Sequence, residues 1–217
     1  MKRSVDILIS LVGLILLLPL FAIVAALIKA EGKGRVFFRQ ERIGKDFKPF
    51  TIYKFRTMVE NAPRLGPGLT VAGDRRITNV GRFLRRTKLD ELPQLFNVLR
   101  GEMSLVGPRP EIPRYVDLFK QDYEEILRVR PGITEAASIK YRNEASVLAG
   151  TSDPEREYLQ HILPEKIALA KEYLANASFV YDTRIVLSTV FHLIHPGNRR
   201  VVRVAGSDRS SQRREAQ

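Results

Sequence analysis

The sequence predicts an α-rich α+β protein, with an N-terminal membrane helix followed by a compact, mostly helical domain that contains a small β hairpin. Three observations support this: a 22-residue run without charged side chains at 7–28, short aromatic and β-branched runs at 36–38 and 50–53, and helical repeats of apolar residues after residue 88. The 217 residues are 44% hydrophobic and 28% charged, proportions that are ordinary for a globular protein and exclude a chain of many membrane spans.

The apolar run at 7–28 is long enough to cross a hydrocarbon core of roughly 30 Å. Pro19 lies within it, where its missing N–H removes one helical hydrogen bond and favours a kink. Lysine and arginine residues flank both ends of the run, and such residues prefer the cytoplasmic side. We therefore favour a re-entrant membrane helix hairpin over residues 1–30. A kinked single span and a cleavable signal peptide are the alternatives.

The positive charge is concentrated in the first half of the chain. The formal net charge is +12, and residues 1–110 carry 20 basic against 9 acidic side chains. This indicates a polyanionic partner for the first half: nucleic acid, anionic lipid headgroups or a phosphorylated substrate. The chain has no cysteine, which excludes disulfides, thiolate metal sites and a cysteine nucleophile.

Beyond the membrane segment, turn-prone residues at 44–46 separate two extended runs and predict the small hairpin. Residues 61–79 are rich in glycine and proline and predict a long loop. Apolar residues at three- and four-residue intervals then predict a helix that ends at Gly101, and Pro93 places its first turn close to 90–93.

Two helices are expected in the last third of the chain. Asp153 and Pro154 begin one that runs to about residue 176, with an interruption near Pro164. The other, at 184–195, is apolar and belongs either to the core or to the membrane surface; we favour membrane contact.

Asp90 and Glu91 fall at the start of the helix before Gly101. Acidic residues cap many helix starts, so capping is the simplest interpretation of the pair. Their surroundings favour a chemical role: basic residues that include Arg86 lie just upstream, and Arg109 is held between two prolines. A guanidinium on so restricted a backbone can bind phosphate through two hydrogen bonds at low entropic cost. The pattern indicates a site for a charged phosphate ester.

Several segments resemble the signatures of the monotopic phosphoglycosyl transferases, also called bacterial sugar transferases, and follow the family's order. They are residues 54–58, 89–101, 103–110 and 130–134. With the N-terminal apolar run and Asp182, the resemblance covers about residues 2–195. It implies a catalytic domain at 31–198. The basic, polar residues 199–217 are expected to form a disordered tail.

The resemblance implies transfer of a sugar-1-phosphate from a nucleotide-sugar donor, normally a UDP-sugar, to a polyprenyl phosphate acceptor. The reaction would start glycan assembly at the cytoplasmic face of the bacterial inner membrane. Asp90 would be the nucleophile that forms a covalent phosphosugar intermediate, and Glu91, together with Asp90, would bind Mg²⁺. The expected substrate and phosphate contacts are Arg109, Lys54, Arg142 and Arg86. Membrane phospholipids are expected partners, nucleic acid is not, and a homodimer is one option for the assembly.

The chain departs from the family pattern in two places. Leu18 precedes Pro19 where the family often has serine, which removes a hydroxyl that could satisfy a freed carbonyl at a kink. After Thr134, residues 135–142 differ from the usual segment, and only Arg142 matches it clearly. The sugar is therefore not predicted. The competing class is a membrane-tethered module that binds nucleic acid or lipid, which the charge alone favours.

Overall fold

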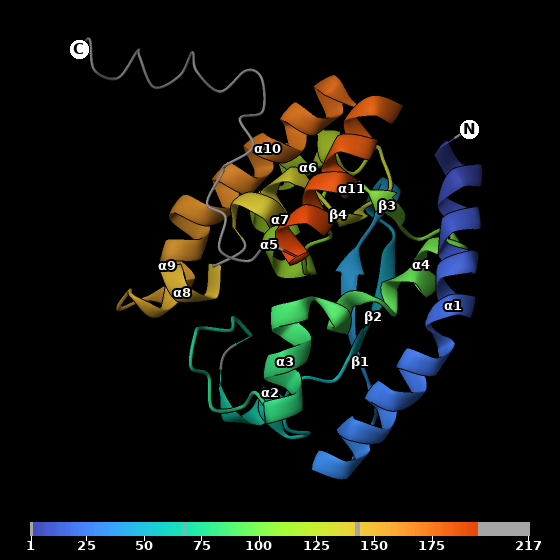
Figure 1. Cartoon of the computed structure of the whole chain (residues 1–217). Coiled ribbons are helices and arrows are strands. Elements are labelled where there is room, and N and C mark those ends of the chain that lie inside the picture. Colours follow the sequence, from blue (N-terminus) through green and yellow to red (C-terminus); the bar gives the residue numbers. More distant parts are fainter. Residues whose placement is uncertain (1, 67, 142–143, 195–217) are drawn as a thin grey trace.

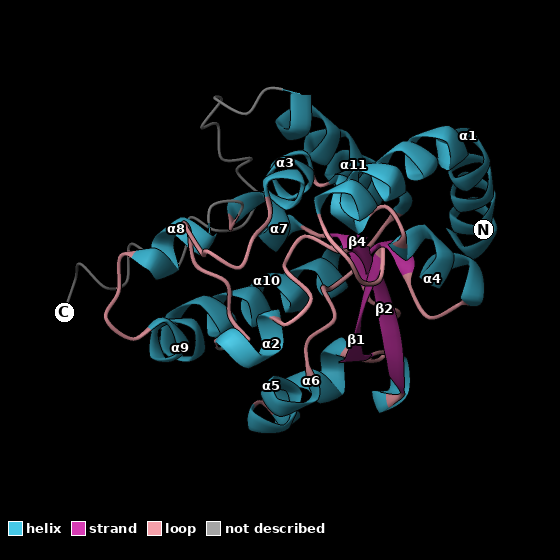
Figure 2. Ribbon diagram, turned by 90° about the horizontal axis from the view of Figure 1, so that it is seen from below, coloured by secondary structure: helices cyan, strands magenta, loops and turns pink. Residues whose placement is uncertain are grey.

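The computed structural model describes residues 2–66, 68–141 and 144–194 and contains many helices and two small two-stranded sheets (Figure 1). This confirms the α-rich α+β prediction. The long N-terminal helix α1 (Lys2–Glu31) runs along one edge of the molecule, and most of the later helices gather on the other side of the hairpin (Figures 1 and 2). Arg142 and residues 199–217 lie outside the described residues.

Helix α1 is continuous over 30 residues and is the single helix in the described chain that is long and apolar enough to cross a membrane. It contains Pro19 and changes direction partway along (Figure 1). It does not fold back on itself, so the expected re-entrant hairpin is not shown. One proline removes one backbone hydrogen bond and bends a helix, whereas a reversal needs a non-helical turn, and the residues on both sides of Pro19 stay helical.

The N-terminal end of α1 is held to the rest of the molecule by polar contacts. Lys2 Nζ lies 2.7 Å from Asp182 Oδ2 and donates to the carbonyl oxygen of Val106 at 2.9 Å. The buried Asp6 carboxylate accepts a hydrogen bond from Ser104 Oγ at 2.7 Å. These pairs join residues about a hundred or more positions apart, so this end of the helix has a fixed place on the domain.

The C-terminal half of α1 packs into a hydrophobic cluster. Val24 and Ile28 are almost fully buried, and they pack with Phe55 and Leu84 from later parts of the chain. Burial of such side chains stabilises the fold by roughly 1.5–3 kcal/mol each. Helix α1 therefore contributes to the core of the domain as well as presenting an apolar surface.

The predicted hairpin is confirmed. Strands β1 (Phe37–Ile43) and β2 (Pro49–Phe55) pair antiparallel, and a 3-10 turn at Lys45–Phe47 joins them. Asp46 adopts φ 57° in this turn. Aspartate tolerates the left-handed region better than most residues, which explains the turn signal at 44–46.

The long loop predicted at 61–79 holds one short helix, α2 (Ala62–Leu65), and ends where α3 (Asn79–Thr87) begins. Thr78 caps α3, because its Oγ1 accepts the N–H of Gly81 at 3.0 Å. A Cβ at Gly81 would lie 2.0 Å from the carbonyl oxygen of Thr57, so only glycine allows α3 to lie this close to the segment after β2.

The helix expected to start close to residues 90–93 and to end at Gly101 is preceded by a 3-10 turn. Leu89–Glu91 form a 3-10 turn, and α4 (Gln94–Arg100) follows Pro93. Lys88 has φ 58°, which turns the chain sharply between α3 and the 3-10 turn. Pro93, which has no N–H, lies between the 3-10 turn and α4. Gly101 adopts φ 86° after the last helical residue, which confirms the predicted end.

The second sheet was not predicted. Strands β3 (Ser104–Val106) and β4 (Gly132–Thr134) pair in parallel. Three residues are too few to show a period of two, so the sequence carried no strand signal there. A Cβ at Gly132, the first residue of β4, would lie 2.1 Å from the backbone nitrogen of Gly107, so only glycine allows β4 to lie this close to the segment after β3.

The remaining helices are short, apart from the last two. Asp153 accepts the N–H of Arg156 at 3.0 Å and caps a helix, and a π-helical turn at Tyr158–Ile162 supplies the interruption expected near Pro164. The final helix begins at Phe179, before the expected residue 184, and exposes several apolar side chains. The bounds are α5 (Pro113–Leu118), α6 (Lys120–Ile126), α7 (Ala136–Lys140), α8 (Glu144–Ala149), α9 (Pro154–Glu157), α10 (Leu163–Asn176) and α11 (Phe179–Ile194).

Candidate active site

Asp90 is buried in the 3-10 turn that precedes α4. It is 7% exposed, and its Oδ1 has no hydrogen-bond partner among the described residues. Burial raises the pKa of Asp90, and the neighbouring Glu91 carboxylate raises it further, while Lys54, Lys88 and Arg85 oppose the shift. A buried carboxylate oxygen without a protein donor is unusual, so this atom is available to an incoming group.

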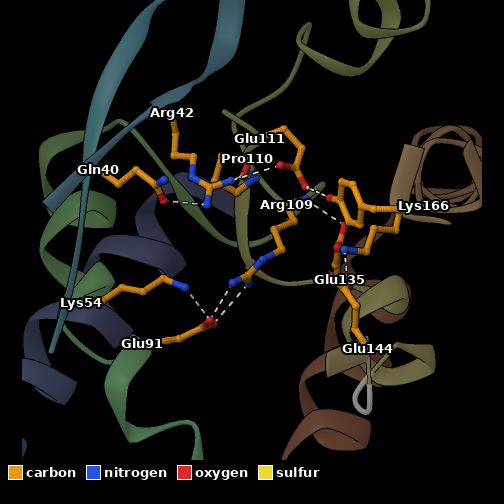
Figure 3. Close-up of polar contacts among 11 residues, drawn as sticks. Gln40, Arg42, Lys54, Glu91, Arg109, Pro110, Glu111, Glu135, Glu144 and Lys166 are labelled. Carbon is orange, nitrogen blue, oxygen red and sulfur yellow. Dashed lines mark hydrogen bonds and ion pairs between the residues drawn. The ribbon is translucent and has the colours of Figure 1, made fainter. Parts of the chain in front are cut away.

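Glu91 has the opposite environment. Its Oε1 accepts hydrogen bonds from Lys54 Nζ at 2.8 Å and from Arg109 Nη2 at 2.6 Å, and its Oε2 accepts one from Arg109 Nη1 at 3.2 Å (Figure 3). Burial favours a raised pKa, but the charges of Arg109 and Lys54 outweigh it and hold the pKa of Glu91 well below its usual range. Glu91 is therefore ionised.

Three separate parts of the chain deliver this cluster. Lys54 comes from β2, Glu91 from the turn before α4, and Arg109 from the segment after β3 (Figure 3). Burial lowers the pKa of Lys54 to about 8, although Glu91 opposes the shift. The structure thus brings together four of the residues that the sequence singled out, namely Lys54, Asp90, Glu91 and Arg109.

Arg86 does not join this cluster. It is exposed on α3, and its side chain makes no hydrogen bond or ion pair with another described residue. Its neighbour Arg85 turns inward instead: Arg85 Nε donates to Thr57 Oγ1 at 2.8 Å, and its charge favours ionised Asp90. Successive helical residues point about 100° apart, so the sequence alone could not distinguish the two arginines.

Glu135 is a residue that the sequence reasoning missed. It follows β4 directly, it is buried, and its Oε2 accepts the backbone N–H of Arg109 at 2.8 Å. Burial raises the pKa of Glu135 to about 7, although Arg109 opposes the shift. The one signal that could have found it was the departure from the family pattern that begins at this position.

A second polar group lies behind Arg109. Glu111 pairs with Arg42 Nη1 at 3.2 Å and accepts a hydrogen bond from Tyr158 Oη at 2.7 Å (Figure 3). A cavity of about 20 Å³ lies between these groups and α10, with room for about one water molecule. Its polar lining consists of Arg109, Glu111, Tyr123, Glu135 and Lys166.

The carboxylate pair fits a magnesium ion that shares its coordination with a substrate. Within the described residues no group of three or more acidic or histidine side chains forms a complete metal cluster. Mg²⁺ is often held by only one or two carboxylates together with water and substrate phosphates. The unpaired Asp90 oxygen and the adjacent Glu91 supply such a donor set.

A buried carboxylate pair that faces a lysine and an arginine suits a charged phosphate compound, and the long apolar helix α1 is typical of a membrane-associated protein. The chain belongs to the bacterial sugar transferase family, whose model matches residues 1–196. Membership of this family favours a transferase over the alternative suggested by the positive charge, a membrane-tethered module that binds nucleic acid or lipid.

Curated relatives support the same family. An Aeromonas hydrophila UDP-N-acetylgalactosamine-undecaprenyl-phosphate N-acetylgalactosaminephosphotransferase is 39% identical over 194 residues, which are 87% of this chain and 42% of that protein. The exopolysaccharide production protein ExoY of Sinorhizobium fredii is 37% identical over 87% of this chain and 83% of its own length. A Klebsiella pneumoniae UDP-glucose:undecaprenyl-phosphate glucose-1-phosphate transferase is 38% identical over 88% of this chain and 39% of its own length. The chain thus spans about two fifths of two of these proteins and most of the third.

Proposed function

We propose that this protein transfers a sugar-1-phosphate from a UDP-sugar to undecaprenyl phosphate and so starts the assembly of an exopolysaccharide or related glycan. The observation that carries the proposal is the buried Asp90 carboxylate with an unpaired oxygen beside the Lys54, Glu91 and Arg109 cluster. The names of the Aeromonas and Klebsiella relatives supply the two substrate classes, a UDP-sugar and undecaprenyl phosphate.

In the proposed reaction an Asp90 oxygen attacks the β-phosphorus of the donor. The new bond joins Asp90 to phosphorus, the bond from that phosphorus to the bridging oxygen breaks, and UMP leaves with the electron pair. A phosphate oxygen of undecaprenyl phosphate then attacks the same phosphorus. This second attack releases the Asp90 carboxylate and forms the polyprenyl diphosphate sugar.

The basic side chains have a different part in this proposal. Arg109 and Lys54 balance the charge of Glu91 and, with a donor bound, bind phosphate oxygens. Lys54, Lys88 and Arg85 favour the ionised form of Asp90 that nucleophilic attack requires. Arg86, on the exposed side of α3, and Arg142 are proposed as further substrate contacts.

We assign Mg²⁺ to Glu91 and Asp90 on the chemistry of this donor set. The ion would offset the negative charge of the diphosphate. Two features of the chain would keep the two carboxylates side by side for this ion. Asp90 and Glu91 share one 3-10 turn, and Lys54 and Arg109 hold Glu91 by hydrogen bonds.

We further propose that α1 enters and leaves the membrane on one side, the cytoplasmic face of the bacterial inner membrane. A helix of 30 residues is about 45 Å long, and both of its ends contact the same domain, through Lys2 at one end and Ile28 at the other. A span would carry the Lys2 end to the opposite side of the bilayer. The lipid-facing surface would consist of the exposed Leu8, Ile15, Leu16 and Leu18.

This topology can be tested with reporters at residue 1 and at residue 217. Both should be cytoplasmic, and a cysteine introduced at the N-terminus should resist a membrane-impermeant label added from the periplasm. Labelling from that side would establish a span instead.

The activity itself can be tested by incubating the purified protein with radiolabelled undecaprenyl phosphate, Mg²⁺ and a panel of UDP-sugars. We expect one or more sugars to give a radiolabelled lipid diphosphate sugar and an equal amount of UMP. Release of UDP would identify an ordinary glycosyl transfer and contradict the proposal, as would a folded protein that turns over no sugar in the panel.

A further inference from the structure

Glu135 holds the backbone of Arg109 from the far side of the candidate active site. Its carboxylate oxygen Oε2 accepts the Arg109 N–H at 2.8 Å, and the side chain is 6% exposed. We propose that Glu135 is a positioning residue for the transfer reaction, which fixes Arg109 so that its guanidinium is held at the carboxylate pair. This inference rests on the proposed role of Arg109 in binding phosphate.

The parallel strands explain why Glu135 can reach this N–H. The segment after β3 runs along β4: the N–H of Gly107 donates to the carbonyl of Thr134, the last residue of β4, at 3.2 Å, and the N–H of Gly132, its first residue, donates to the carbonyl of Pro108 at 2.9 Å. The residue that follows β4 is therefore placed beside the segment that follows β3.

The segment after β3 has a single backbone N–H that needs a hydrogen-bond acceptor. Pro108 and Pro110 have no backbone N–H, so Arg109 carries the single backbone donor between Gly107 and Glu111. Glu135 satisfies this donor with a buried carboxylate. Two prolines restrict the backbone torsions, and one hydrogen bond then sets the position of the peptide from which the arginine side chain extends.

The other end of Arg109 is fixed as well. Its Nη2 and Nη1 donate to Glu91 at 2.6 and 3.2 Å. Arg109 is thus held between Glu135 at its backbone and Glu91 at its guanidinium (Figure 3). Without the Glu135 contact the guanidinium could still pair with Glu91, but the peptide from which the side chain extends could shift, and small displacements of a charge-stabilising group reduce rates strongly.

Lys166, which lies near Glu135, cannot take the place of Glu135 as the acceptor for the Arg109 N–H. Lys166 lines the same small cavity as Glu135, but its Nζ pairs with Glu144 Oε2 at 2.5 Å. A lysine has no hydrogen-bond acceptor when charged, so it cannot take over the N–H of Arg109. Within the described residues, the side-chain acceptor for that N–H comes from Glu135.

The test compares two replacements of similar size. Glu135→Met removes the acceptor and keeps the length of the side chain, whereas Glu135→Gln keeps an acceptor oxygen. We expect the methionine variant to lose about tenfold or more in kcat, with a smaller change in KM for the UDP-sugar, because a misplaced guanidinium stabilises the transition state less. The glutamine variant should keep activity within about threefold, since the hydrogen bond remains.

A double-mutant cycle decides whether Glu135 acts through Arg109. Arg109→Ala alone should be strongly impaired, and adding Glu135→Met to it should lower the rate by no more than about twofold. If the rate losses of Arg109→Ala and Glu135→Met multiply in the double variant, the inference is overturned. Equal rate losses in Glu135→Met and Glu135→Gln would overturn it as well. An Arg109→Ala protein with normal kinetics would contradict the proposed function of Arg109 itself, which separates the two failures.

Asp153→Ala is the matched control. It removes a similar bond between a carboxylate and a backbone N–H, that of Asp153 with Arg156, at the start of α9. We expect its kinetics to match the unmodified protein at a temperature where both are folded. If the methionine variant is recovered unfolded, Glu135→Ala provides the same deletion without bulk, and wild-type rates in that variant would overturn the inference.

Discussion

Asp90 and Glu91 are adjacent in the chain but have opposite electrostatic environments. Burial and the charge of Glu91 raise the pKa of Asp90, whereas Arg109 and Lys54 outweigh burial and lower that of Glu91. Two carboxylates whose pKa values are driven apart commonly divide the work of a site between them. Glu91 pairs with two cations, whereas the Oδ1 of Asp90 is unpaired within the described chain, so the proposed reaction gives the nucleophilic role to Asp90.

Replacement Asp90→Asn keeps the shape of the side chain and removes its nucleophilic charge. The unmodified protein should release about one UMP per active site from donor alone, before acceptor is added, and the variant should release none. Asp153→Asn is a suitable control, because asparagine caps a helix as well as aspartate does. Normal turnover in Asp90→Asn, or UMP release that requires both substrates together, would exclude the covalent route.

Glu135 should make the stability of the protein depend on pH. Its pKa is raised from 4.5 to about 7 by burial, with Arg109 and Lys166 opposing and Glu111 adding to the shift. Between these values the native state binds a proton that the unfolded state has lost, so this group makes the protein less stable as the pH rises from about 4.5 to 7.

The variant Glu135→Gln cannot ionise and should lack this dependence. At pH 8 it should exceed the unmodified protein by roughly 3 kcal/mol in free energy of unfolding, and at pH 4, below both pKa values, the two should be nearly equal. Denaturant unfolding in one detergent at both pH values measures the difference. If the difference in free energy of unfolding between the two proteins is the same at both pH values, the raised pKa of Glu135 is contradicted.

Among the elements, the hairpin depends on one side chain from a helix. Asn97 of α4 is fully buried: its Oδ1 accepts the N–H of Tyr53 at 3.2 Å, and its Nδ2 donates to the Thr51 carbonyl and to Glu102 Oε2, each at 2.7 Å. A strand edge buried without such partners would carry unpaired peptide groups. Asn97 therefore completes β2 in place of a third strand.

We expect Asn97→Ala to lower the free energy of unfolding by about 2–4 kcal/mol, because it leaves buried backbone groups unpaired. Asn176→Ala is the matched control, since Asn176 makes one exposed hydrogen bond, to the Glu172 carbonyl, and its loss should change stability by less than about 0.5 kcal/mol. Thermal or denaturant unfolding measures both. Equal stability of the two variants would show that the edge of β2 does not need Asn97.

The sequence predicted those elements whose signal is local. The helical nature of the apolar run, the β hairpin and the glycine after α4 each depend on neighbouring residues and are confirmed, whereas the re-entrant fold expected of the apolar run is not shown. The parallel pair of β3 and β4 depends on contact between segments far apart in the chain, and the turn between α3 and the 3-10 turn at Leu89–Glu91 depends on the left-handed conformation of Lys88. Neither leaves a periodic pattern.

The same distinction holds for the site. Lys54, Glu91 and Arg109 belong to segments whose residue types already indicated phosphate chemistry, and the structure brings them into contact. Glu135 acts on a backbone N–H 26 residues away, which no side-chain pattern could reveal. Sequence therefore identified the charged groups and missed what holds one of them in place.

At the scale of the whole molecule, the positive charge at the candidate site is already engaged by protein carboxylates. Lys54 and Arg109 pair with Glu91, and Lys54, Lys88 and Arg85 act on Asp90, so a bound diphosphate would add negative charge to cations that already face carboxylates. The net charge of +12 belongs to the whole chain and is largely screened beyond about 10 Å at ordinary salt. A divalent cation bound close to the phosphates would offset that added negative charge.

Removal of divalent cations by EDTA should therefore abolish turnover, and added Mg²⁺ should restore it. The measurement is UMP release, with the circular dichroism spectrum recorded in chelator as a control for folding. Full activity in EDTA would end the assignment of a metal to Glu91 and Asp90.

The contact between Lys2 and Asp182 also constrains how the protein is made. A ribosome delivers α1 first, Ser104 and Val106 emerge about midway through the chain, and Asp182 on α11 is among the last of the described residues to emerge. Lys2 therefore gains its ion-pair partner only when translation is nearly complete. Contacts between such distant residues close slowly, so newly made copies would pass through a period in which the candidate site residues have all been made but α1 is not yet fixed to α11.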